Sequence, residues 1–307
     1  MREFDLLQHI YASNPGLDRR VLIPPGDDMG MVRLRASKGN ILAAVDQLVD
    51  GRHVRLATTP IELVGRKAIT RSLSDIAAMG AQPLATLVAA TLPPDFGQHR
   101  ANELFDAMRT TAEKYDCPLI GGDLAFHSNA SHPMVCSVTV LAEPVNDRVA
   151  RRDGAKAGDG VYVTDRLGGS LQSDGQGRHL TFEPRIREGM EILKSLGDRL
   201  HAMIDISDGL GRDASHNAEM SKVRIVLWAD QIPCNPGCDW RRALSDGEDY
   251  ELLFAASREV QQKIAGTKIT KVGEVLARDA NDPRLVIVKD GHREIDAAEL
   301  GWEHASQ

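Results

Sequence analysis

The chain has few cysteines and no long apolar run. Its 307 residues include four cysteines, Cys117, Cys136, Cys234 and Cys238, which are too few for a disulfide framework in a chain of this length. Cys234 and Cys238 lie four residues apart, but a zinc site would need two further soft ligands, and none is suitably spaced. Because the sequence shows no cleavable N-terminal apolar segment and no run of membrane-spanning length, we expect a soluble, cytoplasmic protein.

Positive charge is scarce relative to negative charge. Lys and Arg total 37 residues and Asp and Glu total 44, so the net charge is −7. This balance argues against nucleic acid or an anionic membrane as the main partner. No Gly-Lys pair occurs, which excludes a Walker A loop and with it a P-loop kinase. No glycine-rich loop of the protein-kinase type is paired with a downstream catalytic Asp motif either.

Length and patterning predict two domains. A chain of 307 residues exceeds a typical single domain and can bury a core that needs no metal or disulfide. Strand-like runs alternate with helical stripes in both halves, which predicts an α/β fold. The composition becomes polar, basic and glycine-rich across 143–159, so we predict an N-terminal domain over 1–147 and a C-terminal domain over 148–307.

Individual elements follow from the apolar periodicity. Thr59 can cap a helix that has Pro60 in its first turn and ends at Gly80. Further helices are predicted over 3–11, 104–115 and 186–196. Strands are predicted over 40–45, 84–91, 119–120, 134–141, 161–164, 203–206, 223–228, 250–254 and 285–288. The segment 168–177 is a glycine-rich loop, and its composition indicates flexibility.

Aspartates recur at the ends of the strand-like runs. The runs end at Asp27 and Asp28, Asp46, Asp123, and Asp205 and Asp208, while Asp75 lies inside the helical stripe. If these carboxylates converge at strand ends, they repel each other, because two unit charges ~4 Å apart cost about 4 kcal/mol at an effective dielectric constant of about 20. Oxygen ligands select Mg²⁺, Mn²⁺ or Ca²⁺, and Mg²⁺ keeps positions open for substrate phosphates. The pattern predicts metal-dependent phosphate chemistry, although each aspartate alone could simply cap a helix or start a turn.

One motif has a competing interpretation. The string Gly209-Leu-Gly-Arg-Asp-Ala214 matches the dinucleotide-binding fingerprint, and Asp230 ends the next strand at the expected distance. Against this interpretation, Asp205 and Asp208 would direct negative charge at a pyrophosphate without a metal. The turn also starts too far from the preceding strand. A further alternative is a glycine-rich helix start that is capped by Ser207 or Asp208.

Seven short motifs occur in one order along nearly the whole chain. They are Pro25-Gly-Asp-Asp28, Asp46-Gln-Leu-Val-Asp-Gly-Arg-His53, Leu73-Ser-Asp-Ile-Ala-Ala-Met-Gly-Ala-Gln-Pro83, Leu119-Ile-Gly-Gly-Asp123, Gly154-Ala-Lys-Ala-Gly-Asp159, Asp205-Ile-Ser-Asp-Gly-Leu210 and Ser245-Asp-Gly-Glu-Asp-Tyr-Glu-Leu252. The set resembles the thiamine-monophosphate kinase family, and the third and the last strings are highly specific to it. The wider superfamily, with aminoimidazole ribonucleotide synthetase and selenophosphate synthetase, shares an ATP-binding acidic cluster.

The resemblance implies a fold, a reaction and a site. It implies a two-domain α/β architecture of mixed sheets, like that of aminoimidazole ribonucleotide synthetase, in which the N-terminal domain forms the barrel of a homodimer. The implied reaction converts ATP and thiamine monophosphate to ADP and thiamine diphosphate. The implied ligands of several Mg²⁺ ions are Asp28, Asp46, Asp75, Asp123, Asp205 and Asp208, of which the first five are also the implied catalytic residues. The implied contacts are Gly122, Arg152 and Ser207 for ATP, and His53, Glu248 and Trp302 for thiamine monophosphate.

Three positions depart from the family's pattern. Ala44 and Val45 stand where the family usually has hydroxyl residues before an aspartate, and Leu124 stands where it has Thr after Gly-Gly-Asp. Two alternatives therefore stay open. One is another ATP-dependent member of the superfamily with a different acceptor. The other is a degenerate, noncatalytic nucleotide- or metal-binding protein.

Overall fold

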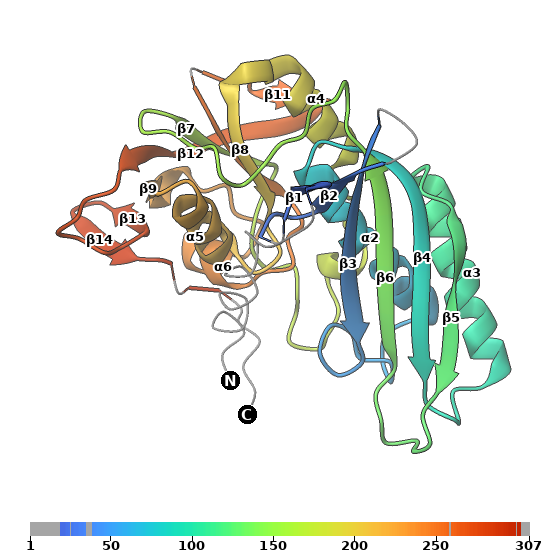
Figure 1. The fold of residues 1–307 in the computed structure, drawn as a ribbon. Helices are drawn as coiled ribbons and strands as arrows, with labels where there is room; N and C mark the ends of the chain where they lie inside the picture. The colour runs from blue at the N-terminus through green and yellow to red at the C-terminus, as the bar shows by residue number, and fades with distance from the viewer. Residues whose placement is uncertain (1–18, 25, 35–38, 258, 299, 302–307) are drawn as a thin grey trace.

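The described part of the chain contains two β-sheets with helices packed beside and between them (Figure 1). This part comprises residues 19–24, 26–34, 39–257, 259–298 and 300–301 of the computed structural model. The α/β fold with mixed sheets is confirmed. The predicted helix over 3–11 and the predicted substrate residue Trp302 lie outside the described residues.

The first sheet is built from the N-terminal half. Within the described residues its strand order is β1-β2-β3-β6-β4-β5. The strands are β1 (Val21–Ile23), β2 (Gly30–Arg33), β3 (Asn40–Val49), β4 (Gln82–Leu92), β5 (Leu119–Phe126) and β6 (Val135–Glu143). Neighbouring strands pair antiparallel except β4 and β5, which are parallel. Strand β5 forms one edge of the sheet (Figure 1).

Helices α2 (Ile61–Ala78) and α3 (Gln98–Lys114) pack against each other and against this sheet. Gly65 allows their close approach, because a Cβ atom at this position would lie 2.7 Å from the Leu104 carbonyl oxygen. Helix α2 begins directly after Pro60 and has no side-chain cap, so the predicted cap at Thr59 is wrong. Beyond its end the chain turns at Gly80 with a φ of 59°.

The second sheet is built from the C-terminal half. Within the described residues its order is β14-β13-β9-β12-β7-β10-β8, and β11 pairs with β12 beside this path. Its strands are β7 (Gly160–Thr164), β8 (Leu200–Asp205), β9 (Val223–Trp228), β10 (Leu252–Ala256), β11 (Lys263–Ile264), β12 (Thr267–Ala277), β13 (Val286–Asp290) and β14 (Arg293–Asp296). The helices of this half are α4 (Ile186–Leu196), α5 (Leu210–Met220) and α6 (Trp240–Ser245), with 3₁₀ turns η2 (Arg178–Leu180), η3 (Gly197–Arg199) and η4 (Ala229–Gln231).

The topology rules out the dinucleotide-binding interpretation of the Gly209–Ala214 motif. That interpretation requires β8 and β9 to be neighbouring parallel strands, but β12, β7 and β10 lie between them. Helix α5 follows the motif with Gly209 at its N-cap and no side-chain cap, so the predicted caps at Ser207 and Asp208 are also wrong. Instead, the Asp208 amide donates a hydrogen bond to the Asp213 carboxylate at 3.0 Å.

Helix α2 joins the two halves, because it also contacts α4 and β8. A Cβ atom at Gly189 of α4 would lie 2.1 Å from the carbonyl oxygen of Ala77 in α2, so backbone meets backbone there. The predicted domain boundary at 147/148 falls between the end of β6 at Glu143 and the start of β7 at Gly160. Because one hydrophobic cluster contains residues of both sheets, the boundary itself stays a prediction. Among the described residues, no helix has both the length and the apolar character needed to cross a membrane.

Candidate active site

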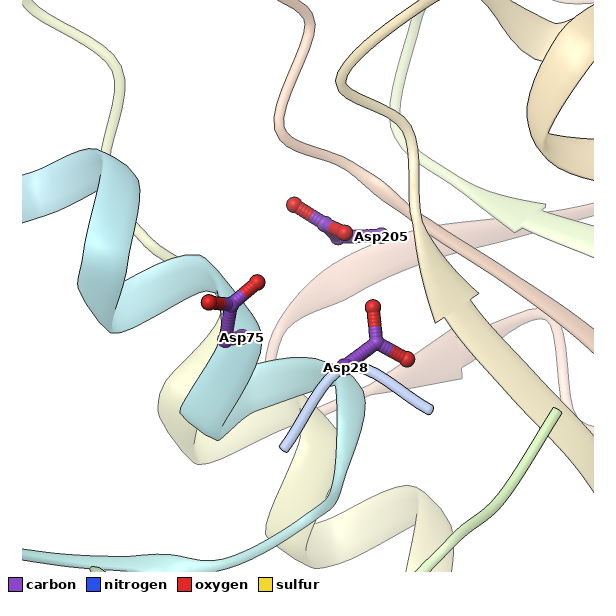
Figure 2. Close-up of side chains that lie close together, drawn as sticks. All are labelled: Asp28, Asp75 and Asp205. Atoms are coloured by element: carbon purple, nitrogen blue, oxygen red, sulfur yellow. The ribbon is translucent and has the colours of Figure 1, made fainter. Parts of the chain in front are cut away.

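Three buried or half-buried carboxylates from separate parts of the chain point toward one another (Figure 2). Asp28 lies between β1 and β2, Asp75 lies on α2, and Asp205 ends β8. Each residue offers a carboxylate oxygen, and these oxygens all lie within 4.8 Å of one another. Helix α2 places Asp75 from one half of the molecule close to the end of β8 in the other half. We call Asp28, Asp75 and Asp205 the carboxylate group.

Burial makes the charges of this group costly. Burial and the charge of Asp28 raise the pKa of Asp205 to about 8, although Ser74 Oγ donates a hydrogen bond to Asp205 Oδ2 at 2.6 Å. Burial and the charge of Asp46 raise the pKa of Asp75 well above its ordinary value. Oxygen-only donors that repel each other suit a hard divalent cation such as Mg²⁺, which would neutralise them.

Arg152 lies against this group. Its Nε atom donates to Asp28 Oδ2 at 2.9 Å, and its Nη2 atom contacts Asp28 Oδ1. Burial by itself lowers the pKa of Arg152, but the charge and hydrogen bonds of Asp28, together with the charges of Asp27 and Asp205, raise it above its ordinary value. The guanidinium therefore stays charged and holds Asp28 in a two-pronged hydrogen bond.

The remaining predicted ligands lie outside the carboxylate group. Asp46 on β3 faces Arg71 of α2, with 3.5 Å between Asp46 Oδ2 and Arg71 Nε. Asp208 follows β8 in the sequence and lines a cavity described below. Asp123 is exposed on the edge strand β5, in register with Ala89 of β4. The expected convergence of strand-end aspartates therefore holds for Asp205, but it does not extend to Asp123 within the described residues.

A cavity of about 220 Å³ borders the carboxylate group through Asp46, whose charge acts on Asp75 and Asp205, and through Ser207 and Asp208, which follow Asp205 in the chain. We call it the central cavity, and it is lined by Asp46, Arg52, His53, Arg71, Leu171, Ser207, Asp208, Asp246, Glu248 and Tyr250. A second cavity of about 320 Å³ shares Arg52, His53 and Leu171 with it and extends along the segments 51–55 and 171–175. The structure thus brings together His53, Glu248 and Ser207, which the sequence alone could not place relative to one another.

A buried lysine behind this cavity was not predicted from the sequence. Lys67 on α2 is fully buried, and its Nζ atom donates to the His53 carbonyl oxygen at 2.7 Å. The same Nζ atom lies 2.6 Å from His179 Nδ1 and contacts Glu248 Oε2. Lys67, Arg71 and Asp75 follow one another at intervals of four residues, which puts all three on one face of the helix. That spacing is the signal that could have identified Lys67.

The charge of Glu248 is set by its buried neighbours. Burial by itself raises the pKa of Glu248, but the contacts with His179 and Lys67 lower it to about 2. Burial lowers the pKa of Lys67 to about 8, against the raising effect of Glu248. Both groups are therefore mainly charged at neutral pH, and the central cavity has a permanently ionised carboxylate in its wall.

Replacing Glu248 with Gln should destabilise the protein in a pH-dependent way. Because the folded-state pKa is about 2 and the ordinary value is 4.5, the ionised carboxylate contributes stability above pH 4.5 that is lost as the pH falls toward 2. The difference in unfolding free energy between wild type and variant should be on the order of 3 kcal/mol near neutral pH. Urea titrations from pH 7 to pH 3.5 should show this difference shrinking. The control is Glu191→Gln, at a partly exposed position on α4. A pH-independent difference for Glu248→Gln contradicts the assignment.

The segment that carries Glu248 has a strained backbone. Glu248 and Tyr250 have φ angles of 55° and 53°, a region that costs non-glycine residues about 1–3 kcal/mol. Hydrogen bonds hold this conformation: the Glu248 amide donates to the Ser207 carbonyl at 2.6 Å, and the Tyr250 amide donates to the Ile206 carbonyl at 2.7 Å. The Tyr250 ring also stacks on Phe182 with 4.1 Å between centroids. These hydrogen bonds fix Glu248 directly beside Ile206 and Ser207, the residues that follow Asp205.

The glycine-rich loop 168–177 is anchored, contrary to the flexibility predicted from its composition. Buried Asp249 accepts hydrogen bonds from the Gly168 amide at 2.9 Å and from Ser170 Oγ at 2.5 Å. The loop reaches the opposite segment through a 3.2 Å hydrogen bond from Arg55 Nη1 to the Ser173 carbonyl. A second bond of 3.3 Å runs from Gln176 Nε2 to the Thr58 carbonyl. These two loops together form the wall of the second cavity.

Backbone packing requires a glycine at position 122. A Cβ atom at this position would lie 1.9 Å from the Val88 carbonyl oxygen, which no side chain can tolerate without a shift of the strand. The close approach lies where β5 pairs with β4. The role in ATP binding that the family resemblance implies for Gly122 therefore stays a prediction, because packing alone accounts for this glycine.

The fold is that of the AIR synthase-like class, and residues 26–143 match the family model described as AIR synthase related protein, N-terminal domain. A thiamine-monophosphate kinase from Rhodopirellula baltica is 33% identical over 251 residues, which cover 77% of this chain and 76% of the relative. One from Bacillus subtilis is 29% identical, with 99% of both chains covered. The solved structure described as AaThiL complexed with AMPPCP and TMP superposes with a TM-score of 0.79 at 27% identity, covering 99% of this chain and 97% of that chain. The chain belongs to the thiamine-monophosphate kinase family.

Proposed function

We propose that the chain transfers the γ-phosphoryl group of ATP to thiamine monophosphate and releases ADP and thiamine diphosphate. The observation that carries the proposal is the position of the carboxylate group next to a cavity lined by His53 and Glu248. The relative complexed with AMPPCP, an ATP analogue, and with TMP supports the same pair of substrates. A terminal phosphate oxygen of the acceptor attacks the γ-phosphorus, and the bond to the β–γ bridging oxygen breaks as its electron pair leaves with ADP.

The carboxylate group would hold Mg²⁺. Phosphoryl transfer depends on charge neutralisation and in-line positioning, and bound Mg²⁺ supplies the neutralisation at the phosphate oxygens. Asp28, Asp75 and Asp205 offer converging oxygen donors, and Arg152 fixes the orientation of Asp28. Asp46, Asp208 and Asp123 are proposed as additional ligands. Asp46 is supported by its electrostatic effect on Asp75, Asp208 by its place in the cavity wall, and Asp123 by its motif alone.

The acceptor phosphate is proposed to lie at His53. The Val49 amide donates to His53 Nδ1 at 2.9 Å, so the neutral ring carries its proton on Nε2 and can donate it to a phosphate oxygen. Arg52 and Arg71 add positive charge to the same wall. Glu248 would contact the rest of the acceptor, and Ser207 and Arg152 would contact ATP. Trp302 keeps the acceptor role that the family resemblance implies for it, as a proposal outside the described residues.

Replacing His53 with Ala should separate the two substrates. Loss of a hydrogen bond to a charged phosphate is expected to raise the KM for thiamine monophosphate about tenfold to a hundredfold, because such bonds contribute roughly 1.5–3 kcal/mol. The KM for ATP should change less than about twofold, since His53 is proposed to contact the acceptor and not the nucleotide. Steady-state kinetics with each substrate varied in turn measures both values. A larger increase in the KM for ATP than in the KM for thiamine monophosphate would mean that His53 contacts the nucleotide and not the acceptor.

We also propose that the protein is a homodimer assembled through the N-terminal sheet. Large apolar side chains are exposed on β3 and β5: Val45 is 63% exposed, Ile120 63%, Leu124 48% and Phe126 62%. Exposed apolar edge strands are usually covered in the native assembly, because they otherwise promote aggregation. A second copy of the same sheet has a matching apolar surface, which supports a symmetric dimer.

A product assay tests the proposed function against its two alternatives. Purified protein, ATP and Mg²⁺ are incubated in separate reactions with thiamine monophosphate, with thiamine, and with a different phosphate monoester. The products are identified by phosphorus NMR. Formation of thiamine diphosphate and ADP in equal amounts supports the proposal. Turnover with a different acceptor points to another activity of the superfamily. Binding of ATP without turnover of any acceptor points to a noncatalytic protein.

A further inference from the structure

Lys67 uses every donor of its ammonium group inside the protein. The three hydrogens can be assigned to the His53 carbonyl oxygen, His179 Nδ1 and Glu248 Oε2. The ring of His179 is consistent with this assignment, because its Nε2 atom lies 3.2 Å from the Gly175 carbonyl and can donate to it, which leaves Nδ1 as an acceptor. A fully buried ammonium with three partners holds its neighbours in a fixed geometry.

The three partners come from three different segments around the cavities. His53 lies in the segment after β3, His179 lies in η2 at the end of the glycine-rich loop, and Glu248 lies in the strained turn before β10. Lys67 itself projects from α2, which also carries Arg71 and Asp75. One rigid helix therefore places the acceptor wall and the carboxylate group relative to each other.

We propose that Lys67 is a positioning residue for the acceptor: it holds the His53 backbone and the Glu248 carboxylate at a fixed separation on the wall of the central cavity. This inference rests on the proposed function, because it assumes that the acceptor binds at His53 and Glu248. Glu248 Oε2 accepts a hydrogen bond from Lys67, which leaves Oε1 to face the cavity that Glu248 lines. Lys67 acts on the acceptor through these two residues and does not line either cavity.

The decisive comparison is between Lys67→Met, which keeps the length of the side chain and removes the ammonium, and the control Lys194→Met at an exposed position on α4. Lys67→Met should raise the KM for the acceptor about tenfold to a hundredfold, since small displacements of binding groups have effects of this size. The KM for ATP should stay within about twofold. The control should match wild type in both values. If Lys67→Met melts at a lower temperature but keeps wild-type KM values, Lys67 is merely structural and the proposal fails. The proposal also fails if both KM values rise equally.

The double variant Lys67→Met with Glu248→Gln separates positioning from stability. In Lys67→Met the buried Glu248 carboxylate loses its main cationic partner, so the melting temperature should fall. Adding Glu248→Gln removes that charge and should restore part of the melting temperature while the acceptor KM stays high. This variant also covers the case in which Lys67→Met does not fold. Because Lys67 acts through Glu248, the fold-increase in acceptor KM of the double variant should be smaller than the product of the fold-increases of the two single variants. A fold-increase equal to that product would overturn the proposal.

The assay of wild type distinguishes failure of this inference from failure of the proposed function. If wild type uses a different acceptor, the same comparison of KM values is made with that acceptor. If wild type turns over no acceptor, the proposed function fails, and crystal structures of wild type and Lys67→Met decide the positioning role. Displacement of the His53 carbonyl and the Glu248 carboxylate supports the role, whereas unchanged positions overturn it.

Discussion

Replacing Asp75 or Asp205 with Asn is expected to lower kcat/KM by about a thousandfold while it stabilises the metal-free protein. Each change removes an anionic oxygen donor and keeps the shape of the side chain. The kcat/KM falls because the metal ion that neutralises the phosphates loses a ligand. The metal-free protein becomes more stable because a repulsion between buried carboxylates is relieved. Kinetics at saturating Mg²⁺ and melting curves in the presence of a chelator measure the two effects on the same preparations.

Mg²⁺ should also raise the melting temperature of wild type and have little effect on either variant, because a ligand stabilises the state that binds it. Asp106→Asn on α3, where the side chain is 70% exposed, is the matched control and should behave as wild type. A variant at Asp75 or Asp205 with near-normal turnover at limiting Mg²⁺ would exclude that residue from the metal site.

Introducing Asp at both Ile120 and Phe126 is expected to convert the proposed homodimer to a monomer. The two side chains are among the most exposed apolar residues of the described chain, and a stable dimer must bury roughly 1,600 Å² in total. Placing charges there opposes burial without disturbing the buried core. Sedimentation velocity at several protein concentrations measures the change, with Leu276→Asp on β12 as a control that should stay dimeric. A monomeric wild type would contradict the proposed homodimer.

Much of the fold could be predicted because its signals are local. The apolar periodicity of α4 predicted a helix over the observed residues Ile186–Leu196. The β-branched residues of β9 predicted a strand over the observed residues Val223–Trp228. Strand β12 was not predicted, because a register shift between Lys271 and Gly273 breaks its alternation. The short strands β1 and β2 carry too few residues for a periodic signal.

The site was predictable in its chemistry and less so in its geometry. The run of aspartates identified Asp28, Asp75 and Asp205, and these three do converge. Strand ends alone do not account for this convergence, because of the three only Asp205 ends a strand and most neighbouring strands pair antiparallel. Lys67 escaped notice since a lysine on a helix is normally solvated. Its burial depends on Glu248, which is 181 residues away in the chain.

The backbone contact between Gly189 and Ala77 has a consequence for how substrates reach the site. Since no side chain separates α4 from α2 at that point, the two halves cannot swing apart there without disrupting a packed backbone. The loops 51–55 and 168–177 are tied across the second cavity by the exposed Arg55 bond to Ser173, which can break and re-form without loss of core packing. Passage of acceptor and product is therefore expected to depend on local opening of these two loops and not on separation of the two halves.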